Sequence, residues 1–421
     1  MKILVSCAVL LILATSPAHA DRLTLADALA KRGAYSQTLK IAAYDTEIAD
    51  ENIRLERSGY LPRVDIQGGY TAQQAPQSFI SPFGTFETQN SDYATAGLAV
   101  TQTIYDFGRT GARYDRARAA SEAARFNYKG QEQDIFLRTV SSYFRILQLQ
   151  KLLVAADEEV TQMTDHLRVA QNLFDQGVVT RNDLLQAQVR LAASRQRRLE
   201  TANQLENAWL DLDNQMGEAP DYRRELVEET KIELTEPDKS VVEVVAARAE
   251  IKAQRKLLDA SELEVNEART GYYPELFAKL GLDYVENNKV REQAIMSATV
   301  GLRINLFDGL ATTSRLRQAV KNRARNDERL HQLETDLALE YRTAVNDAKV
   351  ARERIAVTEE SIRQGEENLR INKDRYKEQV GTATDVIDAQ TLLTQIKSDN
   401  YQAVFDYEVA LARVKRAKSE L

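Results

Sequence analysis

The sequence reads QGVVTRNDLLQAQ at residues 176–188 and QVGTATDVIDAQ at residues 379–390. Each stretch contains a glycine, small or β-branched residues, an aspartate and two aliphatic residues, and each lies between long charged segments with helical periodicity. Glycine tolerates the backbone conformations of a tight turn that ends a helix. We therefore expect two helical hairpins that reverse direction at Gly177 and Gly381.

The two turns belong to a larger internal repeat. Two further pairs of motifs recur in the same order: SGYLP (58–62) with TGYYP (270–274), and TIYDFG (103–108) with NLFDG (305–309). This order predicts a duplication in which residues 21–217 and 241–418 are structural repeats. Residues 218–240, which hold two of the seven prolines, would form the linker between them.

Each repeat contains two stretches in which apolar and polar residues alternate, as in strands with two different faces. In the first stretch, even-numbered Val64, Ile66 and Tyr70 alternate with polar Asp65 and Gln67. Strands of this length cross a bilayer on a tilt, with the apolar face in lipid and the polar face in water. The four barrel strands predicted in this way lie at about 63–74, 92–105, 275–286 and 294–307.

Long helices follow the second strand of each repeat. Residues 109–175 and 310–378 contain no proline and little glycine, so each would extend on the order of 100 Å at ~1.5 Å per residue. Helices of this length exceed any globular core and are typical of coiled-coil rods. The other helices expected are return helices at 180–216 and 382–418, which complete hairpins over 109–216 and 310–418, and single helices before the strands at 24–58 and 241–270.

Residues 1–20 have the pattern of a secretory signal peptide, in which Lys2 precedes an apolar run and small residues end at Ala20. The alternatives are a transmembrane anchor, for which the run is short, and a lipoprotein signal at Cys7. Cleavage near Ala20 removes the only cysteine, so the mature chain would contain no disulfide. Without Lys2 the net charge is 55 − 63 = −8, which argues against a nucleic-acid partner.

No segment after residue 20 approaches twenty apolar residues, which excludes a membrane-spanning helix but not membrane-spanning strands. A sheet in lipid must close on itself, because an open edge leaves backbone groups without hydrogen bonds. Four strands are too few, since a barrel needs about eight. Two copies would give a barrel filled by side chains, and three copies would give about twelve strands around a lumen.

With these features the chain resembles the TolC family of outer-membrane efflux proteins. The resemblance covers nearly all of the mature chain. It rests on LTLADALAKRGA near the start, GYLP and GYYP before the strands, YDFG and LFDG after them, the two turns, and RAEI at 248–251. It implies an α+β membrane protein, a homotrimer whose twelve-stranded transmembrane β-barrel, with four strands per chain, continues as a long α-helical coiled-coil barrel. Residues 218–240 would belong to an equatorial region.

The same resemblance implies a function and partners. The family forms passive exit ducts in the outer membrane of Gram-negative bacteria. These ducts contact outer-membrane lipid, extend into the periplasm, and are served by a periplasmic adaptor and an inner-membrane pump or ABC transporter. Small-molecule or drug efflux and dedicated type I protein secretion use near-identical ducts, so both stay open as cargo.

Other classes of function explain the sequence less well. His166 and His331 stand alone in the long helices, so we expect no metal site, no cofactor and no enzyme. A structural coiled-coil protein of the envelope would explain the helices and the signal peptide. It would not explain four amphipathic strands placed symmetrically in a duplication.

Asp385 and Asp388 are spaced i, i+3, which places both carboxylates on one face of the return helix. The matching family segment lines the pore entrance, so the resemblance implies two acidic rings that favour cations. The alternative is that these acids only cap a helix start. Asp183, at the first turn, is the gate candidate. The residues expected at the hairpin tips, where an adaptor would dock, are Gly177, Val178, Val179, Thr180, Gly381, Thr382 and Ala383.

The tips also depart from the family pattern. An aromatic residue and an arginine close the tip in well-known relatives, but neither has a clear match, and Glu378 and Ala383 lie about where they would fall. The closing contacts must therefore differ. Arg181 and Asn182 are the candidates that we name for them.

Overall fold

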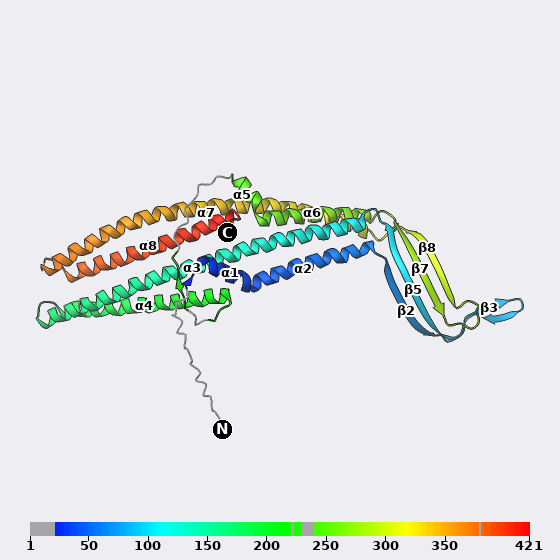
Figure 1. Cartoon of the computed structure of the whole chain (residues 1–421), viewed down its shortest axis with the longest axis horizontal. Helices are drawn as coiled ribbons and strands as arrows, with labels where there is room; N and C mark the ends of the chain where they lie inside the picture. The colour runs from blue at the N-terminus through cyan, green and yellow to red at the C-terminus, as the bar shows by residue number, and fades with distance from the viewer. Residues whose placement is uncertain (1–21, 220–222, 229–239, 379) are drawn as a thin grey trace, which may run out of the picture.

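The computed structural model describes residues 22–219, 223–228, 240–378 and 380–421. Its helices form one elongated body with a sheet at one end, and the two longest hairpins turn at the opposite end (Figure 1). Within the described ranges, none of the helices combines the length and the apolar character needed to cross a membrane. The expected cleavage site near Ala20 and most of the linker lie outside the described residues.

Apart from η1 (Ser58–Tyr60), the main elements of the two halves follow one another in the same order. The first half contains α1 (Leu25–Tyr35), α2 (Gln37–Arg57), β2 (Arg63–Ala72), β5 (Asp92–Tyr105), α3 (Arg109–Asp175) and α4 (Arg181–Met216). The second half contains α5 (Val241–Ala247), α6 (Ala249–Thr270), β7 (Glu275–Val285), β8 (Ala294–Arg303), α7 (Ala311–Lys377) and α8 (Ala383–Ala417). Two small sheets pair β1 (Arg22–Leu23) with β6 (Glu225–Leu226), and β3 (Ser78–Ser81) with β4 (Gly84–Glu87).

The expectation of one unbroken helix before each first strand is wrong. Ser36 ends α1 and starts α2, where its side chain accepts a hydrogen bond from the N–H of Leu39 at 3.2 Å. Arg248 separates α5 from α6 with an extended backbone. Helical propensity is a weak preference, so a capping serine and an arginine with carboxylate partners nearby can override it.

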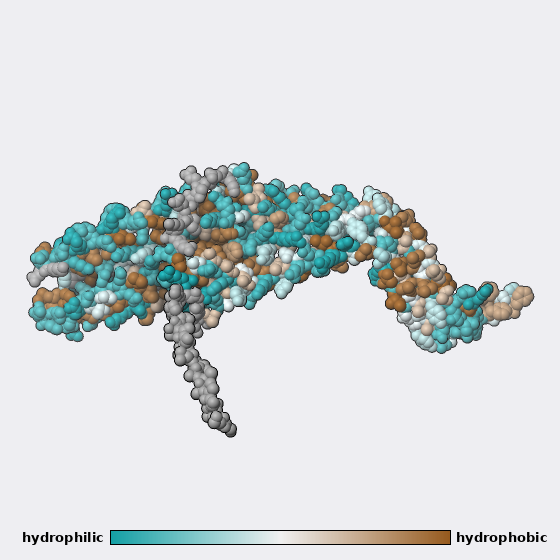
Figure 2. Space-filling view, viewed as in Figure 1, coloured by the Kyte–Doolittle hydropathy of each residue, from teal (hydrophilic) through white to brown (hydrophobic). Residues whose placement is uncertain are grey.

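The larger sheet has the strand order β2-β5-β7-β8, and every neighbouring pair is antiparallel. Its register aligns the even-numbered apolar residues: Ile66 lies opposite Leu98, Leu98 opposite Leu282, and Leu282 opposite Met296. One face of the sheet is therefore apolar across all four strands. This face appears as a brown patch in Figure 2, and Ile66 on it is 85% exposed.

The opposite face of the sheet is polar. Asp65, Lys279 and Asp283 occupy odd-numbered positions of β2 and β7, and Thr101 lies opposite Lys279. Among the described residues, β2 and β8 each have a neighbouring strand on one side only. Both edges of the sheet therefore present backbone groups that a further strand could bind.

A bulge near the end of β5 changes the side to which its last residue points. The register shifts between Thr103 and Tyr105, so that Tyr105 pairs with Leu276 on the apolar face. Phe107 stacks on Tyr273 with ring centroids 5.1 Å apart, and Tyr105 meets Phe107 edge-on at 4.8 Å. These rings gather where the apolar face ends and the helices begin, which is where membrane proteins place aromatic belts.

The repeated motifs after the strands make the same contacts in both halves. Asp106 accepts hydrogen bonds from the N–H and the hydroxyl of Thr110 at 2.8 and 2.6 Å. Asp308 accepts the same pair from Thr312 at 2.9 and 2.7 Å. The carboxylates thus satisfy donors in the first turns of α3 and α7. The glycine of each GY motif packs against this threonine, and a β-carbon there would come within 3.0 Å of its methyl group.

The main apolar core lies midway along the helices, where α3, α4 and α8 meet. Tyr143 and Phe144 of α3 are buried there together with Trp209 of α4 and Phe405 of α8. The hydroxyl of Tyr143 also donates to the carbonyl oxygen of Leu23 in β1 at 2.9 Å. The core therefore holds the middle of the molecule, and the hairpins extend from it.

Candidate functional site

The two long hairpins end at the tip of the molecule opposite the sheet (Figure 1). α3 and α4 are joined between Asp175 and Arg181, and α7 and α8 between Lys377 and Ala383. All the site residues predicted from the sequence lie in these turns or in the first two turns of α4 and α8.

The first turn ends α3 as its glycine predicts. Gly177 has a φ of 74°, in the left-handed region. Its N–H donates to the carbonyl oxygen of Phe174 at 2.9 Å, and the N–H of Val178 donates to that of Leu173 at 2.9 Å. These bonds satisfy carbonyl groups at the end of the helix. A residue with a β-carbon at position 177 would be strained.

The second turn reverses the chain at its glycine as well, but with a different backbone conformation. Gly381 lies outside the left-handed region. The N–H groups of Val380 and Gly381 both donate to the carbonyl oxygen of Arg375, at 2.9 and 3.1 Å. A β-carbon at position 381 would lie 3.2 Å from the β-carbon of Arg375. The glycine therefore allows the chain to pass close to the end of α7.

The first aspartate of each turn forms a capping box with a threonine. Asp183 accepts from the N–H of Thr180 at 2.9 Å, and the Thr180 hydroxyl accepts from the N–H of Asp183 at 3.3 Å. Asp385 and Thr382 make the same two bonds at 2.9 and 3.2 Å. The backbone hydrogen bond from each threonine, and then its side chain, lower the pKa of both carboxyls. Capping is therefore one role of Asp183 and Asp385.

Asp388 lies one helical turn beyond Asp385, and both carboxylates are exposed. The nearby Ala389 and Leu393 pack against Leu369 of α7. At 100° per residue, Asp388 lies about 120° around α8 from this contact, and Asp385 lies about 60° from it. The second carboxylate is therefore the more accessible of the two to anything that faces away from α7.

Tyr376, in the last turn of α7, is a tip residue that the sequence analysis missed. Burial and the negative charge of Asp183 both raise the pKa of its phenol. Tyr376 therefore lies within electrostatic reach of the first turn, although it belongs to the second hairpin. Glu378, one of the two residues that lie about where the closing aromatic and arginine of the family would fall, is the C-terminal cap of α7.

Apolar side chains are exposed at both tips, because Val178 is 62% exposed and Val380 is 71% exposed. The side chain of Ala383 lies outside the described residues, so only its backbone is placed. The other predicted tip residues are Thr180 and Thr382 as N-caps, Arg181, Asn182 and Ala383 in the first turns of α4 and α8, and half-buried Val179.

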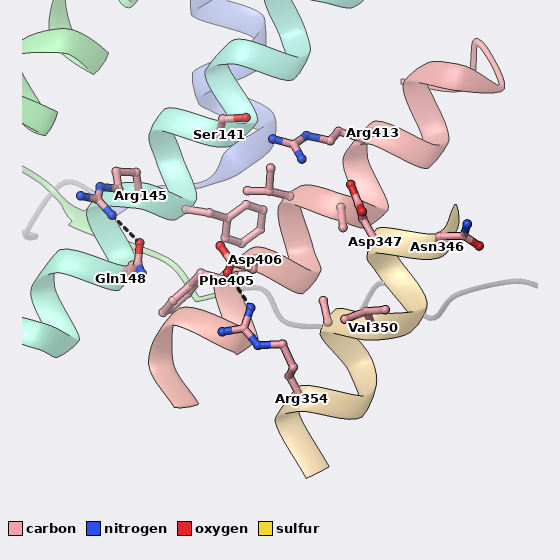
Figure 3. A pocket seen from close by; sticks show the side chains of 14 residues that line it. Ser141, Arg145, Gln148, Asn346, Asp347, Val350, Arg354, Phe405, Asp406 and Arg413 are labelled. Carbon is pink, nitrogen blue, oxygen red and sulfur yellow. Dashed lines mark hydrogen bonds and ion pairs between the residues drawn. The ribbon is translucent and has the colours of Figure 1, made fainter. Parts of the chain in front are cut away.

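A groove of about 490 Å³ lies between α3, α7 and α8 near the middle of the molecule. Figure 3 shows arginines and carboxylates from these helices around it. Arg354 lies 3.5 Å from Asp406, and Arg145 donates to Gln148 at 2.9 Å. Phe405 supplies an apolar wall. The groove separates the second hairpin from α3, and its charged side chains are partly paired with one another.

Rods of 67 residues extend far beyond any compact core, and a sheet with one predominantly apolar face is unsuited to water on both sides. Together they define a class of protein, the outer-membrane channels whose sheet continues as a helical tube. The exposed carboxylates at the rod tips fit the entrance of such a channel.

The chain belongs to the outer membrane efflux protein family, whose model matches residues 30–218 and 241–418. It is similar to the proteases secretion protein PrtF of Dickeya chrysanthemi, with 25% identity over 386 residues that cover 86% of this chain and 83% of the relative. It is also similar to the outer membrane protein TolC of Escherichia coli, with 23% identity over 399 residues that cover 91% of this chain and 79% of the relative.

Solved structures share the fold. The outer-membrane channel OprN matches with a TM-score of 0.84 and 18% identity, over 94% of this chain and 90% of its own. The outer membrane protein VceC from Vibrio cholerae matches with a TM-score of 0.82 and 18% identity, over 94% and 96%. The protein is thus a TolC-like outer-membrane exit duct that works with pump components in efflux or secretion, and its family consists of channels rather than enzymes.

Proposed function

We propose that three copies of the chain form one channel, in which about twelve strands close a transmembrane barrel that continues as a helical tube. The sheet with two open edges carries this proposal. In lipid, unpaired backbone groups along β2 and β8 would each cost several kcal/mol, so both edges must pair with other copies. Two copies would give a barrel filled by side chains, whereas three leave a water-filled bore.

The helical part supports the same assembly. Ile41, Tyr44, Ile48 and Leu55 recur along α2 at helical spacing, and the least exposed of them, Ile48, is 59% exposed. A single copy leaves this apolar stripe in water. In the trimer it would pack against the neighbouring copy, so that the two kinds of hairpin alternate around the tube.

The two faces of the sheet would separate lipid from water. The even-numbered face would contact outer-membrane lipid, and the odd-numbered face would line the bore with Asp65, Lys279 and Asp283. A wet bore lined by charges of both signs suits passive conduction. The helical tube would extend into the periplasm.

At the entrance, Asp385 and Asp388 from three copies would form two rings of carboxylates that select cations. Their exposure on α8 supports this role. Asp183 and Tyr376 come from different hairpins, yet the charge of Asp183 raises the pKa of Tyr376. This proximity makes the two residues our candidates for the contact that holds the hairpins together in a closed state.

The tips are also the surface that we assign to a periplasmic adaptor, with the exposed Val178 and Val380 as its apolar contacts. An inner-membrane pump or ABC transporter would deliver the cargo. Small-molecule or drug efflux is the first candidate cargo. Type I protein secretion is the second, and the similarity to a protein named for protease secretion favours it.

The matching order of elements supports a duplication with repeats at 21–217 and 241–418 and an equatorial linker at 218–240. We also assign residues 1–20 to a signal peptide that is cleaved near Ala20.

Two measurements on purified protein test the proposed channel. We expect unheated protein in detergent to migrate as a trimer of the 47.5 kDa chain, less its signal peptide, and heated protein to migrate as a monomer. In planar bilayers the trimer should give discrete, cation-selective conductance steps. A monomer in lipid, or a chain that stays soluble without detergent, would contradict the proposal. Drug sensitivity and secreted proteins of a deletion strain would separate the two kinds of cargo.

A further inference from the structure

A pocket of about 380 Å³ lies where the helices meet the sheet, between α3, α6 and α7. On α3, Arg109, Arg113 and Arg116 recur at i, i+4 and i+7, so that one face of the helix carries all three. The arginines in the lining outnumber the carboxylates by four to two. These charged residues are Arg109, Arg113, Arg116, Arg315, Glu264 and Glu267.

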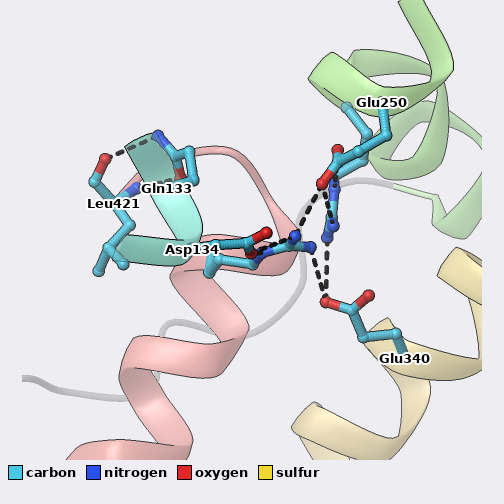
Figure 4. Close-up of polar contacts among 7 residues, drawn as sticks. Gln133, Asp134, Glu250, Glu340 and Leu421 are labelled. Atoms are coloured by element: carbon cyan, nitrogen blue, oxygen red, sulfur yellow. Dashed lines mark hydrogen bonds and ion pairs between the residues drawn. The ribbon is translucent and has the colours of Figure 1, made fainter. Parts of the chain in front are cut away.

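A second group of charges, on the same three helices and α8, has a different balance (Figure 4). Near the middle of the long helices, the buried Arg248 donates to Glu250 from two nitrogen atoms at 3.0 Å each. Arg416 of α8 donates to Glu250 at 2.7 Å and to Glu340 at 2.9 Å. Asp134 of α3 is the third carboxylate of this group. Two cations thus meet three anions, which is the pairing that buried charges require.

The contacts inside the pocket beside the sheet leave N–H donors of its arginines available. Arg113 and Arg116 share one carboxylate, that of Glu267, at 2.7 and 2.9 Å. In the part of the chain that the structure describes, Arg315 has neither an ion pair nor a hydrogen bond. Asp308, which lies within electrostatic reach of Arg315, already accepts two hydrogen bonds from Thr312. Because each guanidinium has five N–H donors, several of them can reach a bound anion.

Contacts with the sheet place the pocket on the same side as the polar face. Arg109 lies 3.6 Å from Glu275, and the hydroxyl of Thr103 donates to the same carboxylate at 3.1 Å. Glu275 and Thr103 occupy odd-numbered positions, and Glu275 pairs with odd-numbered Arg303 of β8. Asn305, which also lines the pocket, continues this odd-numbered series beyond β8. In the proposed trimer the polar face lines the bore, so the pocket would open into the bore.

We propose that this pocket is an anion site in the wall of the bore, which binds oxyanionic groups of the cargo, either carboxylates or phosphates. The inference rests on the proposed function, because it requires a bore through which cargo passes. Planar guanidinium groups match the oxygens of carboxylates and phosphates with two parallel hydrogen bonds. Pores that admit anions are lined by rings of arginine or lysine, as pores that admit cations are lined by rings of acids.

Three copies would arrange these pockets as a collar around the bore. Arg109 to Arg116 spans about 10 Å along α3 at ~1.5 Å per residue, so the collar would be about two turns of helix high. The acidic rings proposed at Asp385 and Asp388 lie at the opposite end of the helical tube. The duct would therefore favour cations at its entrance and hold anionic groups near its exit, which suits cargo with charges of both signs.

The test removes two of the four arginines with the double variant Arg113→Gln and Arg315→Gln. Arg116 stays beside Glu267 in this variant, so the partly buried carboxylate keeps a cation. Arg315→Gln alone is the milder variant, because this side chain is exposed. It keeps the proposal testable if the double variant does not assemble.

The matched control is Arg323→Gln, which removes another arginine of α7. Arg323 pairs with Glu262 of α6 at 3.1 Å. Glu262 lies about 160° around α6 from Glu264, at 100° per residue, and therefore on the face away from the pocket.

In planar bilayers, tripolyphosphate and hexaglutamate serve as the phosphate and carboxylate probes, each added alone on the outer side. We expect at least one probe to reduce the current through the parent trimer, and the double variant to need about tenfold more of it for the same block. Arg315→Gln should show a smaller shift, and the control should match the parent. The probe that blocks at the lower concentration identifies the preferred group. In a salt gradient the double variant should also become more cation-selective.

Two results would overturn the anion site: a conducting parent that neither probe blocks, or a block that is equal in the parent and the variants or falls equally in the control. A parent that does not conduct would instead contradict the proposed channel. Calorimetric titration of tripolyphosphate and hexaglutamate into the protein in detergent would then still test the pocket, because its lining comes from one copy. Binding that the double variant weakens would support the site, and absent or unchanged binding would overturn it.

Discussion

The two hairpin tips begin their return helices alike and end their outgoing helices differently. Both return helices start with a threonine–aspartate capping box. α3 stops at a left-handed glycine, whereas α7 stops where a glycine passes close to Arg375. Asp183 influences Tyr376 of the other hairpin, while the positive charge of Arg375 adds to the lowering of the pKa of Asp385. One sequence signature thus gives the same local cap in two different environments.

Each return helix also buries a carboxyl group, and the two groups differ in the side chains around them. Asp213 of α4 pairs with Arg223 at 2.9 Å. Burial raises the pKa of Glu408 in α8 to about 7. Glu408 lies on the same face of α8 as Phe405 and Ala412, which belong to the main core. The second hairpin therefore contains a carboxyl whose ionisation opposes folding.

Among the variants that test this difference between the hairpins, Glu408→Gln should have the largest effect. In the folded chain Glu408 keeps its proton up to about pH 7. In the unfolded chain, where its pKa has the ordinary value of 4.5, the carboxyl loses its proton at a lower pH. Wild-type stability therefore falls as pH rises from about 4.5 to about 7. We expect the glutamine variant to gain on the order of 2 kcal/mol at pH 8 and little near pH 4. Thermal melts followed by circular dichroism would measure it, and an equal gain at both pH values would contradict the assignment.

The next effect concerns the entrance. Asp385→Asn combined with Asp388→Asn should weaken block by a trivalent cation about tenfold, or about 1.4 kcal/mol, because both of the proposed carboxylate rings would be lost. Asp175→Asn is the matched control, since it removes an exposed carboxylate from the tip of the first hairpin only. Single-channel recordings in planar bilayers measure the block. An equal loss of block in the control would remove the distinction between the two tips.

Replacing the capping threonines separates capping from conduction. Thr180→Ala and Thr382→Ala should each cost about 1 kcal/mol, which hydrogen exchange in the first turns of α4 and α8 would detect. Only Thr382→Ala should also change the pH dependence of cation block. Its bonds lower the pKa of Asp385, so without them the block should be lost at a higher pH as the solution is acidified. A shift of the same size in Thr180→Ala would contradict this.

The smallest effects distinguish the two glycines. Gly177→Ala should cost about 1 kcal/mol, because its φ of 74° disfavours a β-carbon. Gly381→Ala should cost less, because its contact with Arg375 at 3.2 Å can relax by a few tenths of an ångström. Midpoints of thermal unfolding would rank the two variants. A larger cost at position 381 would mean that the second turn depends on its glycine more than the first.

The strands and hairpins could be predicted from the sequence because their signals are local. Alternation over about ten residues identified the apolar face that carries Ile66, and glycine between two long helical patterns identified both turns. The breaks at Ser36 and Arg248 were missed because each residue lies in a stretch of good helix formers. Their own capping and pairing preferences outweigh that background.

The contact between Asp134 and Arg416 and the tip tyrosine could not be predicted in this way. Asp134 and Arg416 are 282 residues apart, and no periodic pattern connects them. Tyr376 was missed because the residue that identifies it, Asp183, belongs to the other hairpin. The sequence therefore identified the right segments at the tips, whereas the neighbours of each side chain depended on how separate helices pack.

The long helices contact different neighbours on the two sides of the middle of the molecule. Toward the sheet, α6 contacts both α3 and α7, so each copy would contribute one continuous layer of helices to the proposed tube. Toward the tips, α4 packs on α3 and α8 packs on α7. The two hairpins are joined mainly near the middle of the molecule, where α3 contacts α8 (Figure 1). If three copies form the proposed tube, it should be stiff beside the membrane and compliant at its far end. A protein that pulls the two hairpins apart would then leave the proposed barrel undisturbed.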